Sequence, residues 1–134
     1  MAIRVVRLGE PRKSDEGTRL GTVRRPPRGV KKQNFGKLDF YDVWVPDLAP
    51  SAQLVGWAVN DTWDDARWKR FVREYRREMK DPRAQRLLSL LAAMSRDANF
   101  SVGCYCEDET RCHRAVLKEL LEDAGAVIAP QPTS

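Results

Sequence analysis

The sequence predicts a single α/β domain in three layers, with a mostly parallel central sheet flanked by helices. The chain has 134 residues, the size of one ordinary domain, and can bury roughly two-thirds of its unfolded surface. Residues 100–129 have the pattern strand, loop, helix, strand, which is a βαβ unit and favours a parallel sheet. We assign residues 1–129 to this domain and residues 130–134 to a flexible tail.

The N-terminal third of the chain predicts two extended segments joined by a long loop. Residues 3–8 form a short β-branched run that predicts a strand. Residues 9–37 are rich in Gly, Pro, Lys and Arg and predict a long basic loop, because their two consecutive prolines exclude a helix. Residues 38–45 predict a second extended segment, which a proline ends.

Three helices are predicted in the middle of the chain. Ser51 is a suitable N-cap for a short helix through about Ala58. The next helix covers residues 62–79, with Asp61 or Thr62 as its cap. Pro82 stands at the tolerated first position of a third helix, which its leucines predict to be largely buried. The helix over 62–79 has one apolar face, formed by Trp68, Phe71, Val72, Tyr75 and Met79.

The C-terminal part predicts the βαβ unit. Residues 100–106 form a strand, and residues 112–124 form a helix with an apolar face. Gly125 is suited to the C′ position that ends this helix. Residues 126–129 are short and apolar and predict a last strand.

The charge of the chain is unevenly distributed. The net charge is +5, but residues 1–37 hold eleven Lys and Arg against three acids, so they carry +8 and the remainder carries −3. A basic segment attracts phosphates and other anions, including nucleic acid. Because no known nucleic-acid-binding motif lies in this segment, a solvated basic loop is the favoured interpretation.

The sequence favours a cytoplasmic protein that does not contact a membrane. No apolar run approaches the roughly 18 residues that cross a bilayer. The first residues lack the apolar core of a signal peptide. No cofactor-binding motif is present, so we expect no cofactor.

Three cysteines lie within nine positions, from 104 to 112. Their odd number and the absence of a secretory context argue against a disulfide framework. Cys112, His113 and Arg114 begin the predicted helix, whose N-terminus attracts anions and lowers the pKa of a cysteine. Arg111 and Arg114 could clamp a phosphate or a carboxylate. The three acids at positions 107–109 act in the opposite sense.

Four interpretations of this cluster compete. Cys112 or Cys104 could be a nucleophile with His113 as its base. A zinc ion could be held by Cys104, Cys106, Cys112 and His113, although no CxxC pair is present and two of these ligands are adjacent. Arg111 and Arg114 could bind phosphate or nucleic acid together with the basic loop. The cysteines could also simply pack in the core, since free cysteine is usually buried.

Distinctive motifs are spread along the whole chain. They are Arg24-Arg25-Pro26-Pro27-Arg28-Gly29-Val30, Trp44 with Asp47-Leu48-Ala49-Pro50-Ser51, then Trp57, Trp68, Phe71 and Tyr75, and finally Cys112-His113-Arg114. In order and spacing these motifs resemble the YeaO-like bacterial family, the domain of unknown function numbered 488, over residues 3–128. The resemblance implies a compact cytosolic α/β domain and no particular reaction. Relatives often have an acid where Cys106 stands, so the resemblance does not imply a thiol mechanism.

The resemblance also brings the N-terminal loop into the candidate site. Arg24, Arg25 and Arg28 are too polar for the core and could close over the Cys-His-Arg segment, which would form a composite anion site. Our leading hypothesis is therefore a cleft that binds a small anionic molecule, with thiol chemistry. The alternatives are a nucleic-acid-binding accessory protein that uses the basic loop, and a structural zinc site without catalysis. The sequence does not decide whether the protein is an enzyme, and it indicates no oligomeric state.

Overall fold

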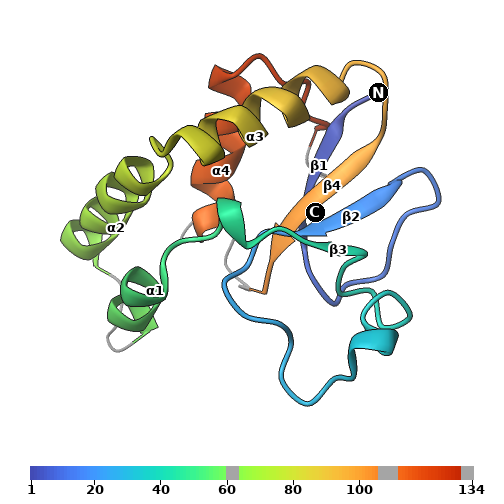
Figure 1. Cartoon of the computed structure of the whole chain (residues 1–134), viewed down its shortest axis with the longest axis horizontal. Helices are drawn as coiled ribbons and strands as arrows, with labels where there is room; N and C mark the ends of the chain where they lie inside the picture. The colour runs from blue at the N-terminus through green and yellow to red at the C-terminus, as the bar shows by residue number, and fades with distance from the viewer. Residues whose placement is uncertain (60–63, 106–111, 131–134) are drawn as a thin grey trace.

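A four-stranded, all-parallel sheet organises the protein. The computed structural model describes residues 1–59, 64–105 and 112–130 (Figure 1). The strands are β1 (Ile3–Arg7), β2 (Thr18–Gly21), β3 (Val43–Trp44) and β4 (Phe100–Cys104), and their order in the sheet is β1-β4-β2-β3. β4 pairs in parallel with β1 on one side and with β2 on the other. The predicted α/β domain with a mostly parallel sheet is confirmed.

The described residues form four α-helices beside the sheet: α1 (Ala52–Val59), α2 (Asp65–Glu78), α3 (Pro82–Met94) and α4 (His113–Asp123). The expected cap at Ser51 is present, since its hydroxyl accepts from the Leu54 amide at 3.1 Å. The Asp81 carboxylate caps α3, and Pro82 is the first residue of that helix as expected. The cap of α2 is Asp64 rather than Asp61 or Thr62, which lie outside the described residues. Within the described part, no helix has the length and apolar character needed to span a membrane.

The main core lies between one face of the sheet and helices α2, α3 and α4, which Figure 1 shows together beside the sheet. The expected apolar face of α2 is buried at Phe71 and Tyr75, whereas Trp68 and Val72 are only partly buried. α3 is less buried than its leucines predict, because Leu90 is 55% exposed. The sheet contributes Ile3, Val5, Phe100 and Val102, and the helices add Leu88, Leu91, Val116, Leu117 and Leu121.

Irregular chain covers the opposite face of the sheet. There the Arg19 guanidinium forms a buried ion pair with Glu16 at 2.8 Å, and the Ser101 hydroxyl donates to the same carboxylate at 2.7 Å. Gly21 is required next to this pair, because a Cβ atom at this position would overlap the ring of Tyr41. The contacts of Glu16 and Tyr41 therefore hold the segments before and after β2 against this face of the sheet.

Three sequence-based boundaries are wrong. Residues 18–21 belong to β2 and not to the long loop predicted over 9–37. The extended segment predicted over 38–45 is reduced to the two residues of β3, since residues 38–42 turn instead. The last strand predicted over 126–129 is reduced to a single bridge between Ile3 and Ile128. These segments are short, and their pairing partners lie far away in the sequence.

Candidate functional site

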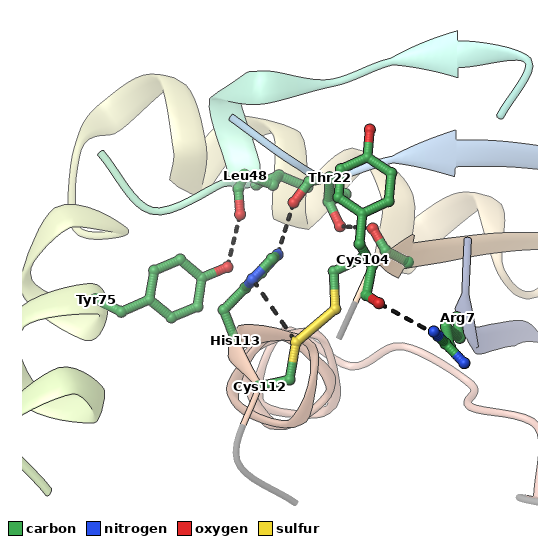
Figure 2. The surroundings of a disulfide bond; sticks show 9 residues. Arg7, Thr22, Leu48, Tyr75, Cys104, Cys112 and His113 are labelled. Atoms are coloured by element: carbon green, nitrogen blue, oxygen red, sulfur yellow. Dashed lines mark hydrogen bonds between the residues drawn. A yellow bond between two sulfur atoms is a disulfide. The ribbon is translucent and has the colours of Figure 1, made fainter. Parts of the chain in front are cut away.

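The cysteine cluster lies where β4 ends and α4 begins. Cys104 is the last residue of β4 and Cys112 is the N-cap of α4, so both stand at the carboxyl end of the sheet, where α/β proteins commonly bind ligands. Their sulfur atoms form a disulfide, with Cα atoms 7.9 Å apart (Figure 2). The sequence argued against a disulfide framework, whereas the structure pairs these two cysteines. Both side chains are almost inaccessible to solvent.

His113 is fixed in one orientation beside the sulfur atoms. Its Nε2 atom lies 2.6 Å from the carbonyl oxygen of Thr22 and its Nδ1 atom lies 4.0 Å from Cys112 Sγ (Figure 2). Because a carbonyl can only accept, Nε2 carries the proton and Nδ1 presents a lone pair to the sulfur. Burial lowers the pKa of His113 to about 4, and the nearby charge of Arg114 acts in the same direction. The imidazole is therefore neutral at pH 7.

Arg114 is a buried cation with no ion pair among the described residues. The residue is 4% exposed, and its Nε and Nη1 atoms have no hydrogen-bond partner among the described residues. It is the second residue of α4, where the positive end of the helix dipole disfavours a cation. A buried charge without a partner is costly, so an anion beside this guanidinium would stabilise it.

Backbone and side-chain contacts hold the surrounding segments together. The Thr22 hydroxyl donates to the Gly103 carbonyl at 2.9 Å, which joins the chain after β2 to the end of β4. Arg7 Nε donates to the Tyr105 carbonyl at 3.2 Å (Figure 2). The Tyr105 hydroxyl in turn donates to the Arg25 carbonyl at 3.0 Å. The loop that the family resemblance implicated therefore does reach the end of β4, through its backbone.

The arginines of this loop have different surroundings. Arg24 is committed to the fold, because its guanidinium donates to backbone carbonyls of the turn before α1. Arg25 and Arg28 are exposed. The structure thus brings Cys104, Cys112 and His113 together, with Arg114 next in the chain, and it directs the Arg24 guanidinium to Pro46, Ala49 and Pro50.

Some predicted residues lie outside the described part, and others were missed by the sequence analysis. Cys106, Arg111 and the acids at 107–109 are not described. Thr22 was missed because β2, which places it at the carboxyl end of the sheet, was taken for a loop. Tyr75 was expected only in the core, yet its ring packs edge-on against His113 with centroids 5.7 Å apart. Recognising β2 would have indicated the role of Thr22.

The arrangement can support two kinds of chemistry. After reduction of the disulfide, the cluster contains two thiols, a neutral imidazole and a guanidinium, which suit thiol chemistry on an anion. Cys104 and Cys112 also offer sulfur atoms, and His113 a nitrogen, that all lie within 4.8 Å of one another. The hydrogen bond from His113 to a carbonyl is typical of metal-ligating histidines. Three such ligands suit zinc with one open position.

Comparison with known proteins supports the resemblance seen in the sequence. A family model described as the active DUF488-N3 subclade matches residues 3–125. The match extends from β1 to the glycine after α4, so it includes the sheet, the helices and the cysteine cluster. No curated protein and no solved structure matches the chain. The chain therefore belongs to the DUF488 family, as a member of its active N3 subclade.

Proposed function

We propose that the cluster of Cys104, Cys112, His113 and Arg114, here called the thiol cluster, binds a small anionic molecule and presents it with a reactive thiol. The unpaired guanidinium of Arg114 carries this proposal. A domain gains nothing in stability from a buried cation at a helix N-terminus, whereas a bound anion would satisfy both the charge and the helix dipole. The description of the matching subclade as active supports a chemical role.

Each residue of the thiol cluster has a different role in this proposal. Cys112, at the N-cap of α4, is the nucleophile, because the helix N-terminus stabilises a thiolate there. His113 is too weak a base to hold the thiol proton at rest, since burial lowers its pKa to about 4. It orients the sulfur atom instead. Cys104 is the second thiol, and its disulfide with Cys112 is the resting oxidised state.

Alkylation of the reduced protein tests the proposal. The rate of iodoacetamide labelling is measured against pH in single Cys→Ser variants at positions 104, 106 and 112, which assign each thiol. Cys112 is expected to react with an apparent pKa below the ordinary value of about 8.5. Inorganic phosphate should slow this reaction. In Arg114→Met, phosphate should give no protection, because the anion loses its cation.

A further variant separates a bound ligand from an internal counter-charge. The acids at 107–109 could themselves neutralise Arg114, so their triple replacement by amides is the control. If an external anion is the partner, this variant keeps or strengthens phosphate protection. The proposal is refuted if Cys112 in wild-type protein reacts with an ordinary pKa of about 8.5 or higher. It is also refuted if phosphate still protects Cys112 in Arg114→Met. Either result would leave the cysteines as core packing.

A metal site is the second candidate, favoured by three ligand atoms that lie within 4.8 Å of one another. Reduced protein would then bind about one zinc ion through Cys104, Cys112 and His113. Zinc titration of reduced protein with a competing chromophoric chelator measures this directly. Binding that is lost in both Cys112→Ser and His113→Gln supports a metal centre, and a failure of reduced protein to compete with the chelator removes it.

A further inference from the structure

A basic groove lies between α2, α3 and α4. It has a volume of about 840 Å³ and is lined by four cations from α2 and by Lys80 just beyond its end. Leu88 of α3 and Leu120 of α4 form part of its apolar lining (Figure 1 shows the three helices). Asp123 is the acid among the lining residues. The cations from α2 are Lys69, Arg73, Arg76 and Arg77.

The cations of α2 form a continuous stripe along one side of the helix. Lys69, Arg73 and Arg77 are separated by four residues each, so their side chains lie above one another on the same face. This stripe extends about 12 Å along the helix axis. A linear row of charges fits a chain of phosphates better than it fits a single small anion, which requires donors that converge.

Much of the positive charge in this groove is not neutralised by the fold. Arg76 binds Glu119 at 2.6 Å, and Arg77 lies 3.3 Å from Glu74. Lys69, Arg73 and Lys80 have no ion pair among the described residues, and Lys69 and Arg73 are exposed. Residues 38–134 carry a net charge of −3, so the groove is a local concentration of cations on an otherwise acidic part of the chain.

We propose that this groove binds the phosphate backbone of a double-stranded nucleic acid. The described residues that line the groove are charged, polar or aliphatic, and none is aromatic. They therefore offer no ring on which unpaired bases could stack. Contacts to phosphates position a duplex without reading its sequence. Binding is therefore expected to be independent of sequence and to weaken steeply as salt rises.

The groove is separate from the thiol cluster. It meets α4 at Leu120 and Asp123 and the C-cap Ala124, whereas the thiol cluster lies at the other end of this helix, about 10–15 Å away along its axis. It is also distinct from the basic N-terminal segment, several of whose arginines are engaged within the fold at Asp15, Glu16 and Asp42. The two proposals can therefore fail independently.

Fluorescence anisotropy with a labelled duplex tests the groove. The probes are duplexes of DNA and of RNA, each about 20 base pairs long and so much longer than the stripe. Wild-type protein should bind at about 50 mM salt and lose affinity steeply by about 200 mM. Lys69→Glu with Arg73→Glu should weaken binding about tenfold or more and reduce the salt slope by about 2. Equal effects on both probes indicate backbone recognition, and a preference for one names the natural ligand.

Two matched double variants control for net charge. Arg83→Glu with Arg86→Glu makes the same charge change on exposed positions of α3 that do not line the groove. Arg28→Glu with Lys31→Glu does so in the N-terminal loop. The affinity of both variants for the duplex should stay within about threefold of wild type at fixed salt.

Three results would overturn the proposal. They are a failure of any duplex to bind at low salt, a loss of affinity in Arg83→Glu with Arg86→Glu as large as in the groove variant, and loss of all binding in the loop variant alone. Lys69→Gln with Arg73→Gln repeats the test without charge reversal, and an unchanged urea-unfolding midpoint shows that the variants are folded.

Discussion

The imidazole Nε2 atom of His113 donates a hydrogen bond to the carbonyl oxygen of Thr22 at 2.6 Å. This contact ties the first residue of α4 to the first residue after β2, although the two are 91 positions apart in the chain. It fixes the tautomer of the only histidine in the protein and directs Nδ1 toward Cys112. The thiol cluster is thus oriented by a strand that the sequence analysis did not recognise.

The titration of His113 is the first prediction. Burial lowers its pKa from 6.5 to about 4, so the folded protein binds fewer protons at this group than the unfolded chain does between these values. The resulting stability is complete above about pH 6.5 and is lost as the pH falls through about 4, with a total near 3 kcal/mol. Because His113 is the only histidine, one imidazole resonance reports its pKa by NMR, measured with chelator present. A midpoint near 6.5 would contradict the buried, neutral assignment.

Replacement of Arg114 should separate stability from binding. Arg114→Met removes a buried charge that has unsatisfied nitrogen atoms and replaces it with an unbranched apolar side chain of similar length. The free energy of unfolding should therefore stay equal or rise by about 1–3 kcal/mol. Urea unfolding of reduced protein in phosphate-free buffer measures this. The same variant should lose phosphate protection of Cys112. A loss of stability larger than about 1 kcal/mol would show that the guanidinium is satisfied within the fold.

The buried ion pair between Arg19 of β2 and Glu16 should contribute strongly to the free energy of unfolding. Burial alone would raise the pKa of Glu16, but hydrogen bonds from Arg19, Ser101 and the Lys13 amide lower it overall. This contribution is therefore present above about pH 4.5 and is lost as the pH falls below it. Glu16→Gln leaves Arg19 buried without its counter-charge and should cost about 3–5 kcal/mol at pH 7.

An exposed ion pair in the same segment provides the control for Glu16. Asp15→Asn breaks the contact between Arg4 and a carboxylate that is 63% exposed. It should cost less than about 1 kcal/mol, because water screens this pair. Urea unfolding of both variants gives the comparison. Similar costs for the two substitutions would mean that the Glu16 pair does not anchor β2.

The disulfide predicts the number of free thiols per chain. Protein purified without reductant and then denatured should show one thiol per chain, and reduced protein should show three, since Cys104 and Cys112 are paired. Cys106→Ser should remove the single thiol of the oxidised form. The disulfide closes a short loop, so reduction should lower the free energy of unfolding by about 2–3 kcal/mol. Three reactive thiols without reductant would show that the cysteines are free in the isolated protein.

The sequence by itself determined the local elements of this protein. The β-branched run at β1, the helical periodicity of α2 and the caps at Ser51 and Asp81 depend on neighbours within a few residues, so they can be predicted without any tertiary information. The succession of β4 and α4 can be predicted in the same way. It places Cys104 at the carboxyl end of a strand and Cys112 at the start of a helix.

Only the tertiary structure decided what joins these elements. Thr18–Gly21 has little strand character of its own and becomes β2 because β4 and β3 pair with it on both sides and because Glu16 neutralises the buried Arg19. The partners of Cys112 and His113 come from segments about 8 and about 90 residues away. Local sequence carries the identity of each group, but burial, hydrogen-bond partners and unpaired charge are properties of contacts between distant segments, and these exist only once the chain has folded.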